Sequence, residues 1–252
     1  MIEVRNVTKK YGSKAVVDNV SLTIARGGVT SFIGPNGAGK STLLSIISRL
    51  MPYDHGEVLI DGQSVARSKS NDLAKKISIL KQENHISVRL TIRELVSFGR
   101  FPYSQGRLTK EDQQYIDAAI EYMELGDLQH RYLDQLSGGQ RQRAYVAMVI
   151  CQNTDYVLLD EPLNNLDMKH AVQIMRVMRR MVEDLGKTVI LVLHDINFAS
   201  CYSDTIVALK DGRVVHQGSV EQIINTQALH DIYDMHIPIE VINDQRIGVY
   251  FT

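Results

Sequence analysis

The sequence predicts an α/β protein built on a parallel β-sheet that helices cover on both faces. Short apolar runs of strand length alternate with helical stretches along much of the chain, and this alternation is typical of parallel sheets. One apolar run, 28–33, leads into a glycine-rich loop and then into a helical stretch at 41–50. A glycine-rich loop between a strand and a helix is typical of phosphate sites. The chain is therefore expected to bind a phosphorylated ligand.

The other elements are expected in the following order. Apolar alternation or clustering predicts strands at 2–7, 20–24, 56–62, 77–80, 156–160 and 189–193. Apolar residues at helical spacing predict a mainly helical stretch at 91–148, with a helix at 112–125, and a long helix that runs from Met168 to Leu185 and stops at Gly186. The methionines of the long helix are expected in the core. Residues 221–252 predict one helix and then a hairpin around Asn243 and Asp244.

Composition sets limits on the class of protein. The chain has 252 residues, 44% of them hydrophobic and 23% charged, and its net charge is −1. This balance is typical of globular proteins and offers no overall field that would recruit nucleic acid. No apolar run approaches the ~18 residues of a spanning helix, and the N-terminus lacks the apolar core of a signal peptide. Cys151 and Cys201 fit no metal-site spacing, so reduced, mostly buried thiols of a cytosolic protein are expected.

The glycine-rich loop has the spacing G-x-x-x-x-G-K-S of a phosphate-binding loop. It consists of Gly34, Pro35, Asn36, Gly37, Ala38, Gly39, Lys40 and Ser41. Because glycine lacks a Cβ, Gly34, Gly37 and Gly39 allow the backbone to curl and to turn successive N–H groups toward phosphate oxygens. Lys40 adds a positive charge, and Ser41 offers a hydroxyl to Mg²⁺. The loop therefore predicts a bound nucleoside triphosphate with Mg²⁺.

Two carboxylates follow a buried strand. Asp160 and Glu161 come directly after the apolar run 156–159, and the carboxyl end of a parallel strand faces the ligand crevice of such sheets. Asp160 is therefore expected to hold Mg²⁺, and Glu161 to activate an attacking water. An acidic pair after an apolar run is also common at solvated strand ends. The catalytic interpretation is favoured because a phosphate-binding loop lies upstream.

A third motif, 136–140, reads Leu-Ser-Gly-Gly-Gln. Its glycines allow close approach of backbone N–H groups to a phosphate, Ser137 can offer a hydroxyl, and a helix expected to begin near Gln140 would add its dipole. The alternative interpretation is a flexible turn before a helix. With the phosphate loop and the acidic pair in this order, the chain resembles the nucleotide-binding subunits of ATP-binding-cassette (ABC) transporters. The resemblance covers nearly all of 1–220.

The resemblance assigns further roles along the chain. Gln82 resembles the family's Q-loop glutamine, 164–167 its D-loop, and His194 its switch histidine, although His194 could instead be a hydrogen-bonded histidine at a strand end. Tyr11 stands where the family stacks an aromatic ring on adenine. Asn164 and Asn165 depart from the small residues that usually begin the D-loop, which puts the detail of contacts between subunits in doubt.

These assignments imply two sets of site residues. The catalytic set is Lys40, Gln82, Glu161 and His194, with Ser41, Gln82 and Asp160 on the metal. Contact with the nucleotide is implied for Tyr11, Gly34, Pro35, Asn36, Gly37, Ala38, Gly39, Lys40, Ser41, Thr42, Ser137, Gly138, Gly139, Gln140 and Asp167.

The resemblance also implies an architecture. The fold is a P-loop NTPase, RecA-like core with an N-terminal antiparallel β subdomain and an inserted α-helical subdomain. Residues 1–252 would form one nucleotide-binding domain. Its core is expected at 1–90 and 151–220, the helical subdomain with the signature at 91–150, and a C-terminal helix and hairpin at 221–252.

The implied partners follow from the transporter family. Two copies would clamp ATP, each nucleotide lying between the phosphate loop of one copy and residues 137–140 of the other. The family also implies two membrane-spanning permease subunits and an indirectly linked extracellular substrate-binding protein, and it implies no nucleic-acid partner. The chain itself is expected to be peripheral, on the cytoplasmic face of the membrane.

A narrower resemblance concerns the cargo. Residues 99–103, Gly-Arg-Phe-Pro-Tyr, followed by Gly106, Arg107 and Leu108, resemble ATPase subunits of bacterial ferric-siderophore importers. The family docks a coupling helix of the membrane subunit in this region, and Phe101 and Tyr103 beside Arg100 suit a small groove. The plainer interpretation is a loop before a helix, with Pro102 as a turn former. The alternatives are vitamin B12 or haem import, an exporter half, a soluble ABC ATPase, and a regulator without turnover.

Overall fold

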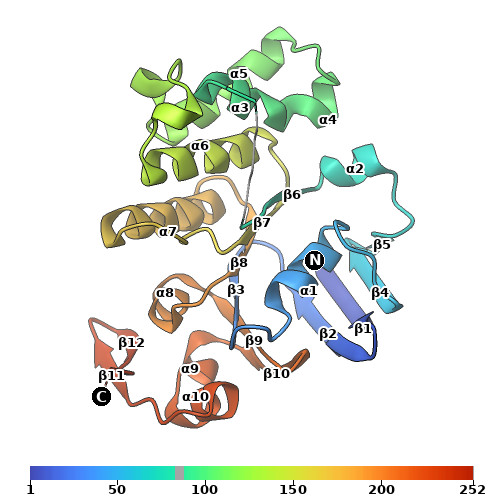
Figure 1. Cartoon of the computed structure of the whole chain (residues 1–252), viewed down its shortest axis with the longest axis vertical. Coiled ribbons are helices and arrows are strands. Elements are labelled where there is room, and N and C mark those ends of the chain that lie inside the picture. Colours follow the sequence, from blue (N-terminus) through green and yellow to red (C-terminus); the bar gives the residue numbers. More distant parts are fainter. Residues whose placement is uncertain (83–87, 252) are drawn as a thin grey trace. The chain divides into compact units, whose positions relative to one another are not determined.

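The computed structural model describes residues 1–82 and 88–251 (Figure 1). The chain forms two compact units. Unit 1 comprises Met1–Ser68 and Met178–Thr252, and unit 2 comprises Lys69–Val177. In the described part of the chain, no helix combines the length and the apolar character needed to cross a bilayer.

An antiparallel sheet begins unit 1. It contains β1 (Ile2–Tyr11), β2 (Lys14–Ile24), β4 (His55–Ile60) and β5 (Gln63–Ser64) in the order β2-β1-β4-β5. Val20, Leu22 and Ile24 are buried while the residues between them are exposed, which is the period of two expected for a sheet with one solvated face. The predicted N-terminal antiparallel β subdomain is confirmed, with β1 and β2 longer than the sequence suggested.

The second sheet of unit 1 carries the phosphate loop. Its strands are β3 (Val29–Ile33), β8 (Thr188–Val192), β9 (Thr205–Lys210) and β10 (Arg213–Gly218), in the order β10-β9-β3-β8. β3 is parallel to both of its neighbours. Every residue of β3 and β8 is buried, as expected for strands whose two faces are both covered. The predicted parallel α/β core is confirmed, and α1 (Lys40–Ile47) follows the loop.

The C-terminal part of unit 1 corrects one prediction. Instead of one helix, the chain forms α9 (Val220–Ile223) and α10 (Thr226–Tyr233). Asn225 separates them because its side-chain oxygen accepts a hydrogen bond from Ala228 N at 2.9 Å and so begins a new helix. The expected hairpin is present as β11 (Ile239–Ile242) and β12 (Gln245–Gly248), and β12 packs on α8 (Ile196–Tyr202).

Unit 2 joins a parallel strand pair to a group of helices. β6 (Ile77–Leu80) pairs with β7 (Tyr156–Asp160). Three helices, α3 (Ile92–Ser97), α5 (Lys110–Tyr122) and α6 (Gly138–Cys151), pack against one another, so the predicted helical subdomain is confirmed (Figure 1). The shorter elements are α2 (Ser70–Ala74), α4 (Phe101–Ser104) and the 3₁₀ turns Phe98–Arg100, Gly126–Leu128 and Leu133–Gln135.

The long helix α7 (Met168–Glu183) leaves unit 2 at Val177 and enters unit 1 at Met178. Met175 and Met178 are buried, as predicted. Met168 is 82% exposed, so its expected place in the core is wrong. It is the first residue of the helix, and an apolar spacing that is correct inside a helix does not determine burial at its first turn.

Candidate functional site

The phosphate loop connects β3 to α1 in unit 1, as the sequence predicts. Gly34, Gly37 and Gly39 have φ values of 135°, 78° and 97°, in the region that favours glycine. A Cβ at Gly34 would collide with the carbonyl oxygen of Leu209, and one at Gly39 would lie 2.5 Å from the Val16 carbonyl oxygen. Sterics of the surrounding backbone therefore require glycine at both positions.

The side chain of Lys40 is buried within the loop. It is only 5% exposed, and its Nζ donates to the carbonyl oxygens of Gly34 at 2.7 Å and Pro35 at 2.9 Å. The ammonium group is thus held over the loop itself. Ser41 and Thr42 follow in the first turn of α1, which carries no acidic residue. The positive end of the helix dipole and the Lys40 charge both favour an anion at this loop.

Two further predicted residues lie in unit 1. His194 follows β8 and is exposed, and the next residue, Asp195, begins α8 by accepting hydrogen bonds from Asn197 N at 2.7 Å and Phe198 N at 3.2 Å. Tyr11 ends β1 with an exposed ring, and its hydroxyl lies 3.1 Å from Met51 Sδ. An exposed aromatic face suits stacking on a base, which stays a prediction.

In unit 2, three predicted elements meet at one carboxylate oxygen. Gln82 Nε2 donates to Glu161 Oε2 at 2.7 Å, and Asn164 Nδ2 donates to the same oxygen at 2.5 Å. The Asn164 backbone N–H also donates to the Glu161 carbonyl at 3.2 Å, closing a turn in which Glu161 has a φ of 51°. Asp160, the last residue of β7, is buried. Two side-chain amides therefore orient the candidate general base.

The structure gives Asn164 a partner that the sequence did not suggest. The sequence marks it only as a departure from the small residues expected there. A longer side chain ending in an amide reaches back three residues to the carboxylate of Glu161, which a serine or alanine could not do in the same way. The i, i+3 spacing after the acidic pair is the signal from which this bond could have been inferred.

The signature motif begins α6 two residues earlier than predicted, at Gly138 instead of near Gln140. Ser137 is the N-cap, and its Oγ accepts from Gln140 N at 3.3 Å while Gln140 Oε1 accepts from Ser137 N at 3.0 Å. This reciprocal capping box fixes the first turn. The interpretation of the motif as a flexible turn is therefore wrong.

Gly139 lies against the side chain of His170, a residue to which the sequence analysis assigned no role. A Cβ at Gly139 would lie 2.5 Å from His170 Cδ2. His170 Nδ1 in turn lies 2.8 Å from Asp167 Oδ1. The pKa of Asp167 is lowered, mainly because its carboxylate accepts a hydrogen bond from the His170 backbone N–H. Within unit 2, His170 thus connects the predicted D-loop aspartate to the signature motif.

Residues 99–103 are helical and not a loop, which corrects the plainer interpretation of this segment: Pro102 lies in the first turn of α4. Arg100 is only 3% exposed, whereas the sequence placed it beside a groove. Its Nε donates to Asp112 Oδ1 at 2.8 Å and its Nη1 to the Cys151 carbonyl at 3.1 Å.

The guanidinium of Arg100 also lies 3.9 Å from the ring centroid of Tyr103 and 4.1 Å from that of Tyr115. The pKa of Asp112 is lowered, chiefly by the backbone N–H of Thr109. Burial raises the pKa of the Cys151 thiol to about 12, consistent with an unreactive, reduced cysteine. The neighbouring residues Phe98 and Phe101 are exposed, Phe101 at 60%.

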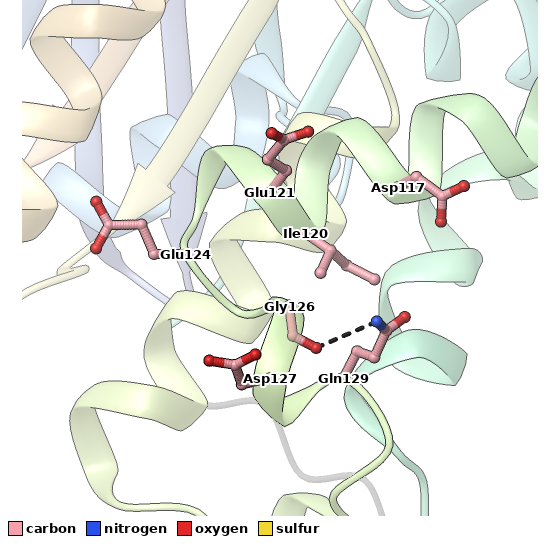
Figure 2. A pocket seen from close by; sticks show the side chains of 7 residues that line it. All are labelled: Asp117, Ile120, Glu121, Glu124, Gly126, Asp127 and Gln129. Atoms are coloured by element: carbon pink, nitrogen blue, oxygen red, sulfur yellow. Dashed lines mark hydrogen bonds between the residues drawn. The ribbon is translucent and has the colours of Figure 1, made fainter.

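A hollow of about 490 Å³ lies elsewhere in unit 2, among residues of α5 and the turn after it (Figure 2). It is lined by Asp117, Ile120, Glu121, Glu124, Gly126, Asp127 and Gln129. Among the residues that the structure describes, no group of three or more His, Cys, Asp or Glu side chains could hold a metal ion. None of the predicted site residues lines this hollow.

We compared this chain, which carries a phosphate loop, a capped signature helix and an oriented glutamate, with known proteins. The ABC transporter family matches residues 17–164. The chain belongs to the ABC transporter family. It is an ATPase of that family, which hydrolyses ATP to ADP and phosphate.

Individual relatives extend the match over the full length. The petrobactin import ATP-binding protein YclP of Bacillus subtilis is 65% identical over 252 residues, 100% of both chains. The petrobactin import ATP-binding protein FatE of Bacillus anthracis is 54% identical over 95% of this chain and 96% of that protein. The ATP-binding cassette MJ0796, solved as a dimer in a post-hydrolysis state with ADP and Pi, is 35% identical, with a TM-score of 0.77 over 87% of this chain and 99% of that one.

Proposed function

We propose that this ABC ATPase powers the import of a ferric siderophore of the petrobactin class. The observation that carries the proposal is the identity of 65% over the whole length to a petrobactin import ATP-binding protein. A second petrobactin import protein, at 54% identity, supports the same cargo. The ATPase subunit does not contact the chelate in this account; it drives the permease that does.

In this proposal, two copies of the chain enclose ATP. The phosphate loop of one copy binds the phosphates, and the capped N-terminus of α6 in the other copy, with Ser137, Gly138 and Gly139, approaches the γ-phosphate. The first turn of α6 carries no acidic residue, so its dipole favours an anion. The dimeric state of MJ0796 with ADP and Pi supports this arrangement.

Each of the site residues then has its own role in hydrolysis. Lys40 neutralises phosphate charge, and Glu161, oriented by Gln82 and Asn164, accepts a proton from the attacking water. His194 orients the γ-phosphate and that water. The hydroxyl of Ser41, the amide oxygen of Gln82 and the carboxylate of Asp160 are hard oxygen donors of the kind Mg²⁺ prefers, so they would hold it. When bound, Mg²⁺ supplies charge neutralisation at the β- and γ-phosphates.

Transport requires that the closure of the two copies be transmitted to the membrane-spanning subunits. We assign this role to the exposed aromatic patch of Phe98, Phe101 and Tyr103, which would receive a coupling helix of each of two permease subunits at the cytoplasmic face. Arg100 lies against the Tyr103 ring and binds Asp112 of α5 and the Cys151 carbonyl of α6, so a displacement of the patch would be transmitted through Arg100 to both helices. A substrate-binding protein outside the cell would deliver the chelate to the permease.

Reconstituted transport tests the proposal. The chain, with its permease subunits in liposomes and a cognate binding protein, is expected to take up ferric petrobactin when Mg-ATP is supplied. The same vesicles carrying Glu161→Gln should take up none. Uptake of haem or vitamin B12 in place of the siderophore would assign another cargo, and ATPase activity without any uptake would contradict the transport role.

Phe101→Asp tests the coupling surface. We expect basal ATPase activity within about twofold of wild type, because Phe101 is exposed and is not among the residues expected to contact the nucleotide, and loss of most ATP-driven uptake. Leu185→Asp is the matched control, since Leu185 is also an exposed apolar residue. Equal loss of uptake in both variants, or loss of ATPase activity in Phe101→Asp alone, would contradict the assignment of this patch.

Asn164→Ala tests the orientation of Glu161. Removing one of two amide donors to Oε2 should lower kcat at least about tenfold, because a hydrogen bond to a charged group contributes about 1.5 kcal/mol or more. KM for ATP should stay unchanged. Asn165→Gly serves as the control, since glycine tolerates the φ of 60° at that position. A kcat equal to wild type in Asn164→Ala would show that this bond does not matter for turnover.

A further inference from the structure

The C-terminal segment, residues 220–251, contacts the phosphate loop. The backbone N–H of Gly34, the first residue of that loop, donates to the hydroxyl oxygen of Tyr233 at 3.1 Å. Tyr233 is the last residue of α10. The segment lies outside residues 17–164 matched by the family, and the separation of 199 positions between the two partners makes this a purely tertiary contact.

The first residue of the loop, Gly34, is therefore held from several sides. Its N–H is bound by Tyr233, its carbonyl accepts from Lys40 Nζ at 2.7 Å, and the place of a Cβ is taken by the Leu209 carbonyl. Burial raises the pKa of Tyr233 to about 12, so the group is a neutral hydroxyl at physiological pH. Without that oxygen, the Gly34 N–H would have no partner from α10, and an unpaired buried N–H is costly.

The same segment also holds the helix that follows His194. In α8, Asn197 Oδ1 accepts from Gly248 N at 2.8 Å, and Asn197 Nδ2 donates to Gly248 O at 3.2 Å. Ser200 Oγ donates to Arg246 O at 2.6 Å. Both acceptor residues belong to β12. The C-terminal segment thus binds both the start of the phosphate loop and the helix directly after the switch histidine.

We propose that residues 220–251 are a positioning element of the nucleotide site, and that Tyr233 is the positioning residue through which they fix the phosphate loop. The inference rests on the proposed function in one respect: the loop must bind ATP. A loop already fixed in its binding conformation loses less conformational freedom when the ligand arrives, so its affinity is higher. Tyr233 itself touches no phosphate in this account.

A competing explanation is that the segment only covers an edge of the sheet. That role would make Tyr233 important for folding stability and leave nucleotide affinity unchanged in the folded protein. The two explanations differ in a measurable way, because a positioning role changes KM and Kd for ATP while kcat at saturating ATP stays the same.

Tyr233→Phe in the full chain removes one oxygen atom and keeps the ring. We expect the Kd for a fluorescent ATP analogue, and the KM for ATP, to rise about three- to tenfold, which is the range for one lost hydrogen bond. The kcat at saturating ATP should match wild type, and the thermal midpoint without nucleotide should fall by no more than about 2–4 °C, because the unpaired Gly34 N–H costs some stability. Tyr202→Phe on α8 is the matched control, since its ring stacks on Phe198 with centroids 6.2 Å apart and its hydroxyl has no role in this account.

The outcomes separate the inference from the function on which it rests. Unchanged Kd in Tyr233→Phe, together with a large loss of binding in Lys40→Ala, would overturn the inference and leave the ATP site intact. Unchanged Kd in both variants would overturn the ATP site itself. An equal rise in Tyr233→Phe and Tyr202→Phe would also overturn the inference, because it would show general loosening of the fold.

Discussion

Glu161→Gln is expected to lower kcat for ATP hydrolysis by at least about a hundredfold, because glutamine cannot take the proton of the attacking water. The substitution is nearly isosteric, and its side-chain oxygen can still accept from Gln82 and Asn164, which now bind Glu161 Oε2. ATP affinity should therefore stay within about threefold of wild type, since the loss concerns only the transition state.

Single-turnover and steady-state phosphate release, with ATP binding measured on the same preparation, check this prediction. Glu124→Gln is a suitable control, because it makes the same chemical change at a carboxylate of unit 2 that lines the hollow in Figure 2. A Glu161→Gln enzyme that turns over within about tenfold of wild type would remove the residue from the role of general base.

Lys40→Ala is expected to weaken ATP binding about ten- to a hundredfold. Hydrogen bonds to charged groups contribute about 1.5–3 kcal/mol, and each 1.4 kcal/mol is tenfold in affinity. The side chain is buried and bound to the Gly34 and Pro35 carbonyls, so its removal also frees the start of the loop. Both effects act on binding, before any chemistry occurs.

Isothermal titration with Mg-ATP measures this loss directly. Lys14→Ala, which removes an exposed lysine of unit 1, should bind ATP like wild type. Lys40→Arg retains the charge but presents a planar fork in place of a point charge, so it should restore only part of the affinity. An ATP affinity equal to wild type in Lys40→Ala would contradict the proposal that this loop binds the phosphates.

The parts of the fold and site that local chemistry determines could be predicted from the sequence. Gly34 and Gly39 are required by positive φ and by close backbone neighbours, so their spacing indicated the loop. The strand 156–160 is buried along its whole length and is apolar up to its last residue, Asp160. Ser137 and Gln140 are a capping box that a sequence can display, although the helix start was expected two residues too late.

The remaining features depend on contacts between distant residues. Arg100 could not be placed in the interior without knowing that Asp112 and Cys151 surround it. His170 gained its role only from the space beside Gly139. Tyr233 lies 199 positions from Gly34, and no periodicity or motif in the sequence connects them. Such partners become visible only when the packing is known.

The oligomeric state of Glu161→Gln with nucleotide tests most directly whether ATP is enclosed by two copies of this chain. Light scattering on a size-exclusion column should show a monomer without nucleotide and a dimer with saturating Mg-ATP, because the trapped triphosphate joins the loop of one copy to the signature of the other. A protein that stays monomeric at saturating Mg-ATP, while binding it, would contradict the shared site.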